Sequence, residues 1–464
     1  MTKSPPAQFS LTCCAVLLET CVLSPTSVRA ADATAKPNVL IFLTDDQGSV
    51  DAGCYGAKDL VTPGVDKLAA DGVRFTQFYS AAPVCSPSRA GLLTGRYPWV
   101  AGMPNNAPDP PSEADDALDT LTGNGLPASE ITMADMFRAA GYATAHIGKW
   151  HLGSGAGHKP LDHGFDYSFG FMGGCIDNYT HFYYWGGEDR HDLWENNRRV
   201  RLPGQYFPDL MIQKAEAFIA THRDRPFFMY FAINMPHYPY QGEPKWIKYY
   251  QDRQLPYPRD IYAAFVSTLD EREQQLMKFL DDNGLRTNTI VVYQSDNGHS
   301  AEERAHYGGG SAGPYRGAKF SLFEGGIRLP AIISWPGHLP AGEVRTQIAH
   351  GCDWLPTLAE LCDVTPPKAA LNGRSLVPVI RSADAPSPHD YLQWELGSQW
   401  SVLQGDWKLI HDPYDPTSTN KIDVVDGHWF LSNIAADPGE RTNQAARHPE
   451  IVAQLKKLKP AGVK

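Results

Sequence analysis

Four apolar runs, each followed at once by polar residues, constrain the fold of this chain most. They are of strand length and lie at 38–43, 142–147, 226–233 and 289–293. Such runs are typical of strands buried on both faces, as in a parallel sheet. Helical patterns separate them, the longest at 260–283. This alternation predicts an α/β fold, in which helices flank a large, mainly parallel sheet.

The residues that follow these runs are of types that perform chemistry. They are Asp45 and Asp46, then Lys149 and His151, then His237, and finally Asp296 and Asn297. Parallel sheets bind ligands outside the carboxyl ends of their strands. We therefore expect these side chains to meet at one edge of the sheet. Taken singly, each has an ordinary reading, such as a solvated turn or a buried structural histidine.

A cysteine beside a short helical pattern predicts a reaction centre. Ser86 and Pro87 suit the N-cap and the first helical position, and Gly95 suits the C-terminal stop. Cys85 should then lie just ahead of the helix, where the N–H groups favour an anion or a thiolate. Arg89, in the first turn, can reach the same anion. The alternative is a buried cysteine before an ordinary helix.

The same residues carry a family resemblance. The segment 85–96 resembles the C-x-P-S-R…L-T-G-R signature of type I, formylglycine-dependent sulfatases, which belong to the alkaline-phosphatase-like superfamily. The segment 148–153 resembles the second signature, G-K-W-H-L-G. The resemblance covers about residues 37–445. Within the family, the chain resembles secreted bacterial sulfatases of the arylsulfatase and N-acetylgalactosamine-sulfatase types.

The resemblance implies a nucleophile and a substrate site. A formylglycine-generating or equivalent modifying enzyme would oxidise Cys85 to formylglycine, whose hydrated aldehyde would attack the sulfur of a sulfate ester. Lys149, His237 and Lys319 would bind the substrate. Together with Arg89, the two lysines would stabilise charge on the transferring group.

Acid and base roles follow from the same chemistry. An alkoxide leaves poorly, so a histidine must protonate it; His237 has the family's Pro-His position, and Lys319 would assist. His151 would help to remove a proton from the second hydroxyl of the hydrated aldehyde, so that sulfate leaves.

The oxygen-bearing residues predict a metal site. Asp45, Asp46, Asp296 and Asn297 offer only oxygen ligands, which selects a hard cation, Ca²⁺ or Mg²⁺. Of these two we expect Ca²⁺. The absence of histidine from this set argues against zinc. The resemblance adds position 85, in its modified form, to the ligands.

The two ends of the chain differ from its middle. Residues 1–30 resemble a secretory signal peptide, with a mostly apolar stretch and a small-residue cleavage site before Ala31, so we expect a secreted or periplasmic protein. Residues 37–370 would form the catalytic domain. Short strand patterns and a closing helix predict a smaller C-terminal domain at 371–464, built of antiparallel strands and a helix.

Charge and cysteine content narrow the function further. The formal net charge of −11 argues against nonspecific binding to nucleic acid or anionic membrane. Cys54, Cys175, Cys352 and Cys362 could be paired or free, although a helical pattern separates the last two too far for a bridge.

The first hypothesis is therefore a sulfatase acting on sulfated glycans or aryl sulfates. The alternatives are a phosphomonoester or phosphonate hydrolase of the same superfamily, and a glycan-binding protein without activity. The complete set of reactive residues argues against the last. The loops at 104–127 and 171–206 are expected to select the sugar.

Overall fold

The main sheet is built around the four apolar runs. We describe it from a computed structural model that covers residues 1–6, 8, 36–109, 124–183 and 190–461. The runs form β1 (Asn38–Thr44), β3 (Ala143–Lys149), β7 (Phe227–Ala232) and β8 (Thr289–Ser295). They are adjacent, in the order β8-β1-β7-β3, and each neighbouring pair is parallel. The predicted α/β core is confirmed, and its carboxyl ends meet at one edge.

The flanks make the sheet mixed. β4 (Tyr167–Phe171) continues the parallel arrangement beside β3, whereas β9 (Arg328–Ser334) runs antiparallel to β8 and to β2 (Val73–Tyr79). Within the described residues the sheet has 11 strands. Its remaining short strands are β5 (Trp194–Glu195), β6 (Arg198–Arg199), β10 (Glu343–Arg345) and β11 (Ala349–His350).

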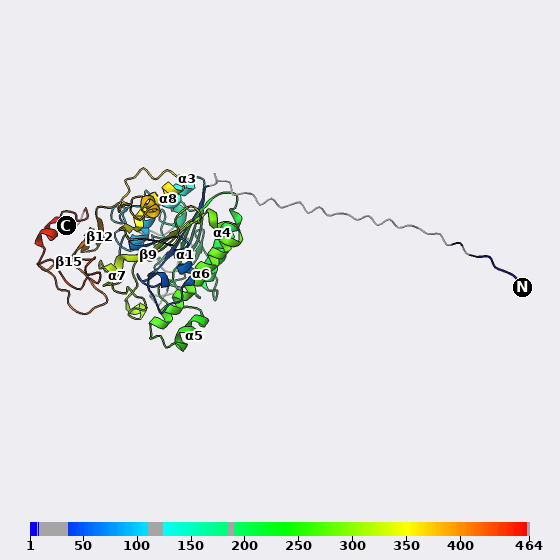
Figure 1. Ribbon diagram of the computed structural model, residues 1–464, viewed down its shortest axis with the longest axis horizontal. Coiled ribbons are helices and arrows are strands. Elements are labelled where there is room, and N and C mark those ends of the chain that lie inside the picture. Colours follow the sequence, from blue (N-terminus) through cyan, green and yellow to red (C-terminus); the bar gives the residue numbers. More distant parts are fainter. Residues whose placement is uncertain (7, 9–35, 110–123, 184–189, 462–464) are drawn as a thin grey trace. The chain divides into compact units, whose positions relative to one another are not determined.

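Helices cover both faces of this sheet (Figure 1). α1 (Pro63–Ala70), α4 (Phe207–Thr221) and α6 (Arg259–Asp282) pack on one face with Leu40 and Phe42 of β1. α2 (Cys85–Thr94), α3 (Met133–Ala139) and α8 (Trp354–Leu361) pack on the other with Val39, Ile41 and Leu43. Successive side chains of a strand point to opposite faces, so an unbroken apolar run serves two cores.

A second sheet forms near the C-terminus, as expected. It consists of the antiparallel strands β12 (Leu392–Leu396), β13 (Gln399–Gln404), β14 (Trp407–His411) and β15 (Trp429–Asn433). α10 (Pro449–Lys456) packs against it through Val452 and Leu455. Residues 36–464 form one compact unit, within which the division at 370 and 371 stays a prediction.

The cysteines and the predicted signal peptide have different outcomes. Cys54, Cys85, Cys175, Cys352 and Cys362 are free thiols. The cleavage site and apolar stretch of the signal peptide lie outside the described residues. Among the residues that are described, no helix combines the length and apolar character needed to cross a membrane.

Candidate active site

Backbone hydrogen bonds between neighbouring strands hold the acidic residues together. The N–H of Asp45 donates to the carbonyl of Met235, and the N–H of Asp296 donates to the carbonyl of Thr44, both at 3.0 Å. These bonds continue the β7-β1-β8 ladder beyond the strand ends. Asp46 has a positive φ of 59°, which turns the chain at this point. The predicted convergence at the carboxyl edge therefore rests on sheet pairing.

Helix α2 brings the cysteine to the same place, with one correction. Cys85 is the first residue of the helix and Val84 the N-cap, so the sequence-based start is two residues late. Ser86 does not cap the helix; its hydroxyl accepts the N–H of Ala107 at 3.0 Å and so ties the following loop to α2. Gly95 ends the helix with φ 66°, as expected.

The cysteine is not a thiolate in this environment. Burial raises the pKa of Cys85 to about 12, although Lys149 and Lys319 act in the opposite direction. The expectation from the helix N-terminus is therefore wrong for the unmodified side chain. Since Sγ lies 3.4 Å from the Lys149 ammonium and 3.8 Å from the Asp45 carboxylate, it still occupies the centre of the charged cluster.

Buried ion pairs surround this position. The Lys149 ammonium lies 2.8 Å from Asp45, and the Lys319 ammonium 2.9 Å from Asp46. Arg89 lies 2.8 Å from Asp296 and also donates to the Lys149 carbonyl at 3.0 Å. These side chains are almost fully buried. Although burial opposes it, Asp45 raises the pKa of Lys149, so this lysine stays protonated.

The carboxylates differ in their electrostatics. Burial alone would raise the pKa of Asp45, but Lys149 and Arg89 hold that pKa below its ordinary value. Burial, reinforced by the charges of Asp45 and Asp296, raises the pKa of Asp46 to about 7 against the influence of Lys319. A cation added at this place would favour the charged form of Asp46.

The two histidines are neutral and differently held. Nδ1 of His237 donates to the Tyr238 carbonyl at 2.7 Å, which leaves its Nε2 as the lone-pair nitrogen, 3.5 Å from Asp46. Burial, Lys319 and Lys149 lower the pKa of His237 well below its ordinary value. Burial and Lys149 do the same to His151, whose backbone has φ 55°.

A cavity of about 160 Å³ opens above these groups. Cys85, His151, His237 and Lys319 line it. It also has walls that motif reasoning missed: Asn106, Asp109, Cys175, Tyr183, Tyr238, Glu302 and Arg304. Asn106, Asp109, Cys175 and Tyr183 lie in the loops 104–127 and 171–206, which were expected to select the sugar, although no motif singled out these residues. Glu302 and Arg304 belong to a polar stretch that follows Asp296 and Asn297.

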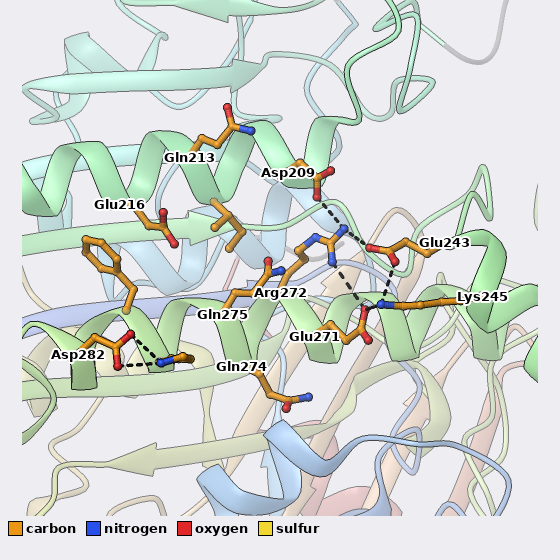
Figure 2. A pocket seen from close by; sticks show the side chains of 13 residues that line it. Asp209, Gln213, Glu216, Glu243, Lys245, Glu271, Arg272, Gln274, Gln275 and Asp282 are labelled. Carbon is orange, nitrogen blue, oxygen red and sulfur yellow. Dashed lines mark hydrogen bonds and ion pairs between the residues drawn. The ribbon is translucent and has the colours of Figure 1, made fainter.

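A larger cavity, of about 780 Å³, lies elsewhere, beside α4, α6 and α5 (Pro244–Asp252). Figure 2 shows that Arg272 pairs there with Asp209 and Glu243. These ion pairs connect the helices, and none of the predicted site residues lines this cavity.

Family models match almost the whole of the described core. The model described as "Sulfatase" matches residues 37–364, and "N-sulphoglucosamine sulphohydrolase, C-terminal" matches 317–459. This chain belongs to the sulfatase family. It is therefore a sulfuric ester hydrolase with the fold of its relatives.

Individual relatives agree with this assignment. The sulfatase is 35% identical to N-acetylgalactosamine-6-sulfatase of Sus scrofa, covering 94% of this chain and 87% of that protein. It is 30% identical to N-acetylgalactosamine-6-O-sulfatase of Bacteroides thetaiotaomicron, covering 91% and 92%. The solved structure of Ps i-CgsB in complex with k-i-k-neocarrahexaose has TM-score 0.77 and 28% identity, covering 91% and 92%.

The phosphonate alternative has weaker support. Phosphonate monoester hydrolase of Agrobacterium radiobacter has TM-score 0.64 at 19% identity, covering 91% of this chain and 95% of that one. At this identity the likeness shows the fold alone.

Proposed function

We propose that this sulfatase removes sulfate from sulfated glycans, with formylglycine at position 85 and a divalent metal ion. The observation that carries the proposal is the placement of Cys85 among three buried cations at the meeting point of four strand ends. The substrate class is supported by the relatives named for N-acetylgalactosamine sulfate and by the neighbouring carrageenan-oligosaccharide complex. We also propose export, on the signal-peptide pattern of residues 1–30.

The residues present fit a metal ion. Three carboxylates face three cations here: Asp45, Asp46 and Asp296 against Lys149, Lys319 and Arg89. An added divalent cation would leave the site two charges positive, complementary to an anionic sulfate ester. The Oδ1 atom of Asn297 is buried and lacks a hydrogen-bond partner among the described residues, so it is available as a metal ligand. When bound, the ion would supply Lewis acidity toward sulfate oxygens; Ca²⁺ suits these ligands better than Mg²⁺.

The protein's own side chains bind and orient the ester. The ammonium groups of Lys149 and Lys319 would hold the sulfate oxygens, and Arg89 would keep Asp296 and the end of β3 in place through its hydrogen bonds. Their charges act in a buried site, where they interact more strongly than in water. Substrate oxygens therefore gather negative charge beside groups that are already positioned.

Proton transfers fall to the histidines. Nε2 of His237 lies 3.5 Å from Asp46, in the same cluster as Cys85. To act as the acid, His237 would first take up a proton at Nε2, which the negative charge of a bound sulfate ester favours, and would then pass that proton to the leaving oxygen. His151 is neutral and lines the cavity with Cys85, so it can accept a proton from the hydrated nucleophile.

Mass spectrometry tests the nucleophile. Protein made with a competent modifying system should carry the aldehyde on the peptide that contains residue 85, and Cys85→Ala should abolish turnover of a sulfate ester. Cys362→Ala, a buried thiol outside the cavity, is the matched control. Full activity of protein whose Cys85 is unmodified would contradict the proposal.

Metal removal tests the cation. After exhaustive chelation, verified by elemental analysis, turnover should stop and return with Ca²⁺. Asp296→Ala should bind the ion more weakly in calorimetry. An unchanged kcat in metal-free protein would rule out the metal's role.

A further inference from the structure

The cavity above Cys85 contains two carboxylates that the proposed reaction does not use. Asp109 comes from the loop after α2, and Glu302 stands just before the 3-10 helix Glu303–Ala305. Both lie among the cavity walls beside His151, which is 5% exposed. Nδ1 of His151 has no hydrogen-bond partner in the described part of the chain. The cavity thus offers a ligand several polar atoms besides those that hold sulfate.

Asp109 is fixed in place by two donors. The hydroxyl of Tyr183 donates to Oδ2 at 2.6 Å, and the N–H of Gly174 donates to Oδ1 at 3.1 Å. Each carboxylate oxygen can accept a further hydrogen bond. Asp109 is therefore a pre-oriented acceptor, held by residues from the predicted substrate-contacting segment at 171–206.

Glu302 is fixed in the same way. Its Oε2 atom accepts from Ser300 at 3.1 Å and from the hydroxyl of Tyr238 at 3.3 Å. Its Oε1 atom lies 3.5 Å from the guanidinium of Arg304. Glu302 and Arg304 thus form an ion pair in the wall of the cavity, and Asp109 adds a second carboxylate to that wall.

Fixed carboxylates of this kind are able to discriminate between sulfated sugars. Fixed carboxylates accept hydrogen bonds from sugar hydroxyls and repel a second sulfate or a carboxylate on the same ring. The volume of about 160 Å³ is well below the roughly 300–1,000 Å³ of pockets that enclose drug-sized ligands. It accommodates one ring rather than several.

We propose that Asp109 and Glu302 determine specificity for a single, otherwise neutral sugar ring that bears one sulfate ester and free neighbouring hydroxyls. This inference rests on the proposed sulfatase function. The cations deep in the site bind the sulfate, and the two carboxylates accept hydrogen bonds from the hydroxyls of the ring.

Kinetics on matched substrates test it. Methyl galactosides and N-acetylgalactosaminides with one sulfate are compared with their disulfated counterparts and with 4-nitrophenyl sulfate, which has no sugar hydroxyls. The unaltered enzyme should prefer the best singly sulfated sugar over its disulfated counterpart at least tenfold in kcat/KM. In Asp109→Asn/Glu302→Gln this preference should fall at least tenfold, and the loss on the sugar should exceed the loss on 4-nitrophenyl sulfate at least tenfold.

Glu303→Gln, an exposed neighbour of Glu302, is the matched control and should keep the preference. Preference of the unaltered enzyme for disulfated sugars would overturn the inference, as would equal losses of the double variant on sugar and aryl substrates. Absence of turnover on every sulfate ester, by protein with confirmed formylglycine, would instead contradict the proposed function itself.

Discussion

At the scale of the residue, the orientation of His237 sets its chemistry. Its Nδ1–H is committed to the Tyr238 carbonyl at 2.7 Å, so only Nε2 is available to the substrate. Replacing it should therefore matter in proportion to the basicity of the leaving group. His237→Ala should cost on the order of 10²–10⁴ in rate on an alkyl or sugar sulfate, because that oxygen needs a proton. The loss should be much smaller on 4-nitrophenyl sulfate, because its 4-nitrophenolate group leaves without being protonated.

Steady-state kinetics on the two substrates measure this difference. His338→Ala, an exposed histidine outside the cavity, should behave like the unaltered enzyme on both. A histidine that only holds its loop would give similar losses on the two esters. That result, with the fold intact by circular dichroism, would move the acid role to Lys319.

At the scale of the element, close packing positions helix α2 and hence Cys85. Every residue of this helix is buried. Gly91 permits the approach: a Cβ there would lie 2.4 Å from Cβ of Ala81 and 3.3 Å from Sγ of Cys352. Such a contact forces neighbouring groups to move, and overpacking costs about 1–3 kcal/mol. The helix can therefore pack this closely against Ala81 and Cys352 only because residue 91 is glycine.

Gly91→Ala distinguishes packing from helix propensity. Alanine is the better helix former by about 1 kcal/mol, so without crowding the substitution would stabilise the protein. We expect a lower free energy of unfolding in denaturant titrations, together with reduced turnover because α2 shifts. Gly351→Ala, whose Cβ would lie 3.4 Å from its nearest neighbour, is the control and should have little effect. Stabilisation by Gly91→Ala would refute the packing argument.

At the scale of the molecule, a buried ion cluster joins the two sheets. Lys408 of β14 lies 2.8 Å from Glu324, in α7 (Glu324–Ile327), and 2.9 Å from Glu440. The segment just before α7 contains both Lys319 and Ser321. The hydroxyl of Ser321 donates to the carbonyl of Tyr414, in the C-terminal region, at 2.7 Å. The C-terminal region thus supports a residue of the active site.

Removing the ammonium of Lys408 should weaken the contact between the C-terminal sheet and the segment around α7. Lys408→Met leaves Glu440 without its cation and leaves Glu324 with Arg328 alone. Breaking a buried ion pair in this way costs about 3–5 kcal/mol. We expect that fall in the free energy of unfolding, measured in urea, and a lower Tm. Lys421→Met, at an exposed position, should change stability little. Equal stability of the two variants would show that the cluster contributes nothing.

Local patterns in the sequence determined much of this protein. Apolar runs of strand length determined β1, β3, β7 and β8. A strand buried on both faces needs apolar side chains at successive positions, and not an alternation of apolar and polar ones. Since the carboxyl ends of adjacent parallel strands share an edge, the meeting of Asp45, Lys149, His237 and Asp296 was also predictable. Capping rules placed the end of α2, although they put its start two residues late, since Val84 has no capping side chain.

Only the tertiary structure decided the electrostatics and the cavity. Burial raises the pKa of Cys85 to about 12 although Lys149 and Lys319 lower it, and this balance depends on the atoms that surround the thiol in space. Asp109 and Glu302 reach the cavity through loops, far apart in the sequence, whose course is set by side-chain hydrogen bonds rather than by periodicity. Short-range patterns predict strands and helices because those depend on neighbours in the chain; charge burial and loop placement depend on neighbours in space.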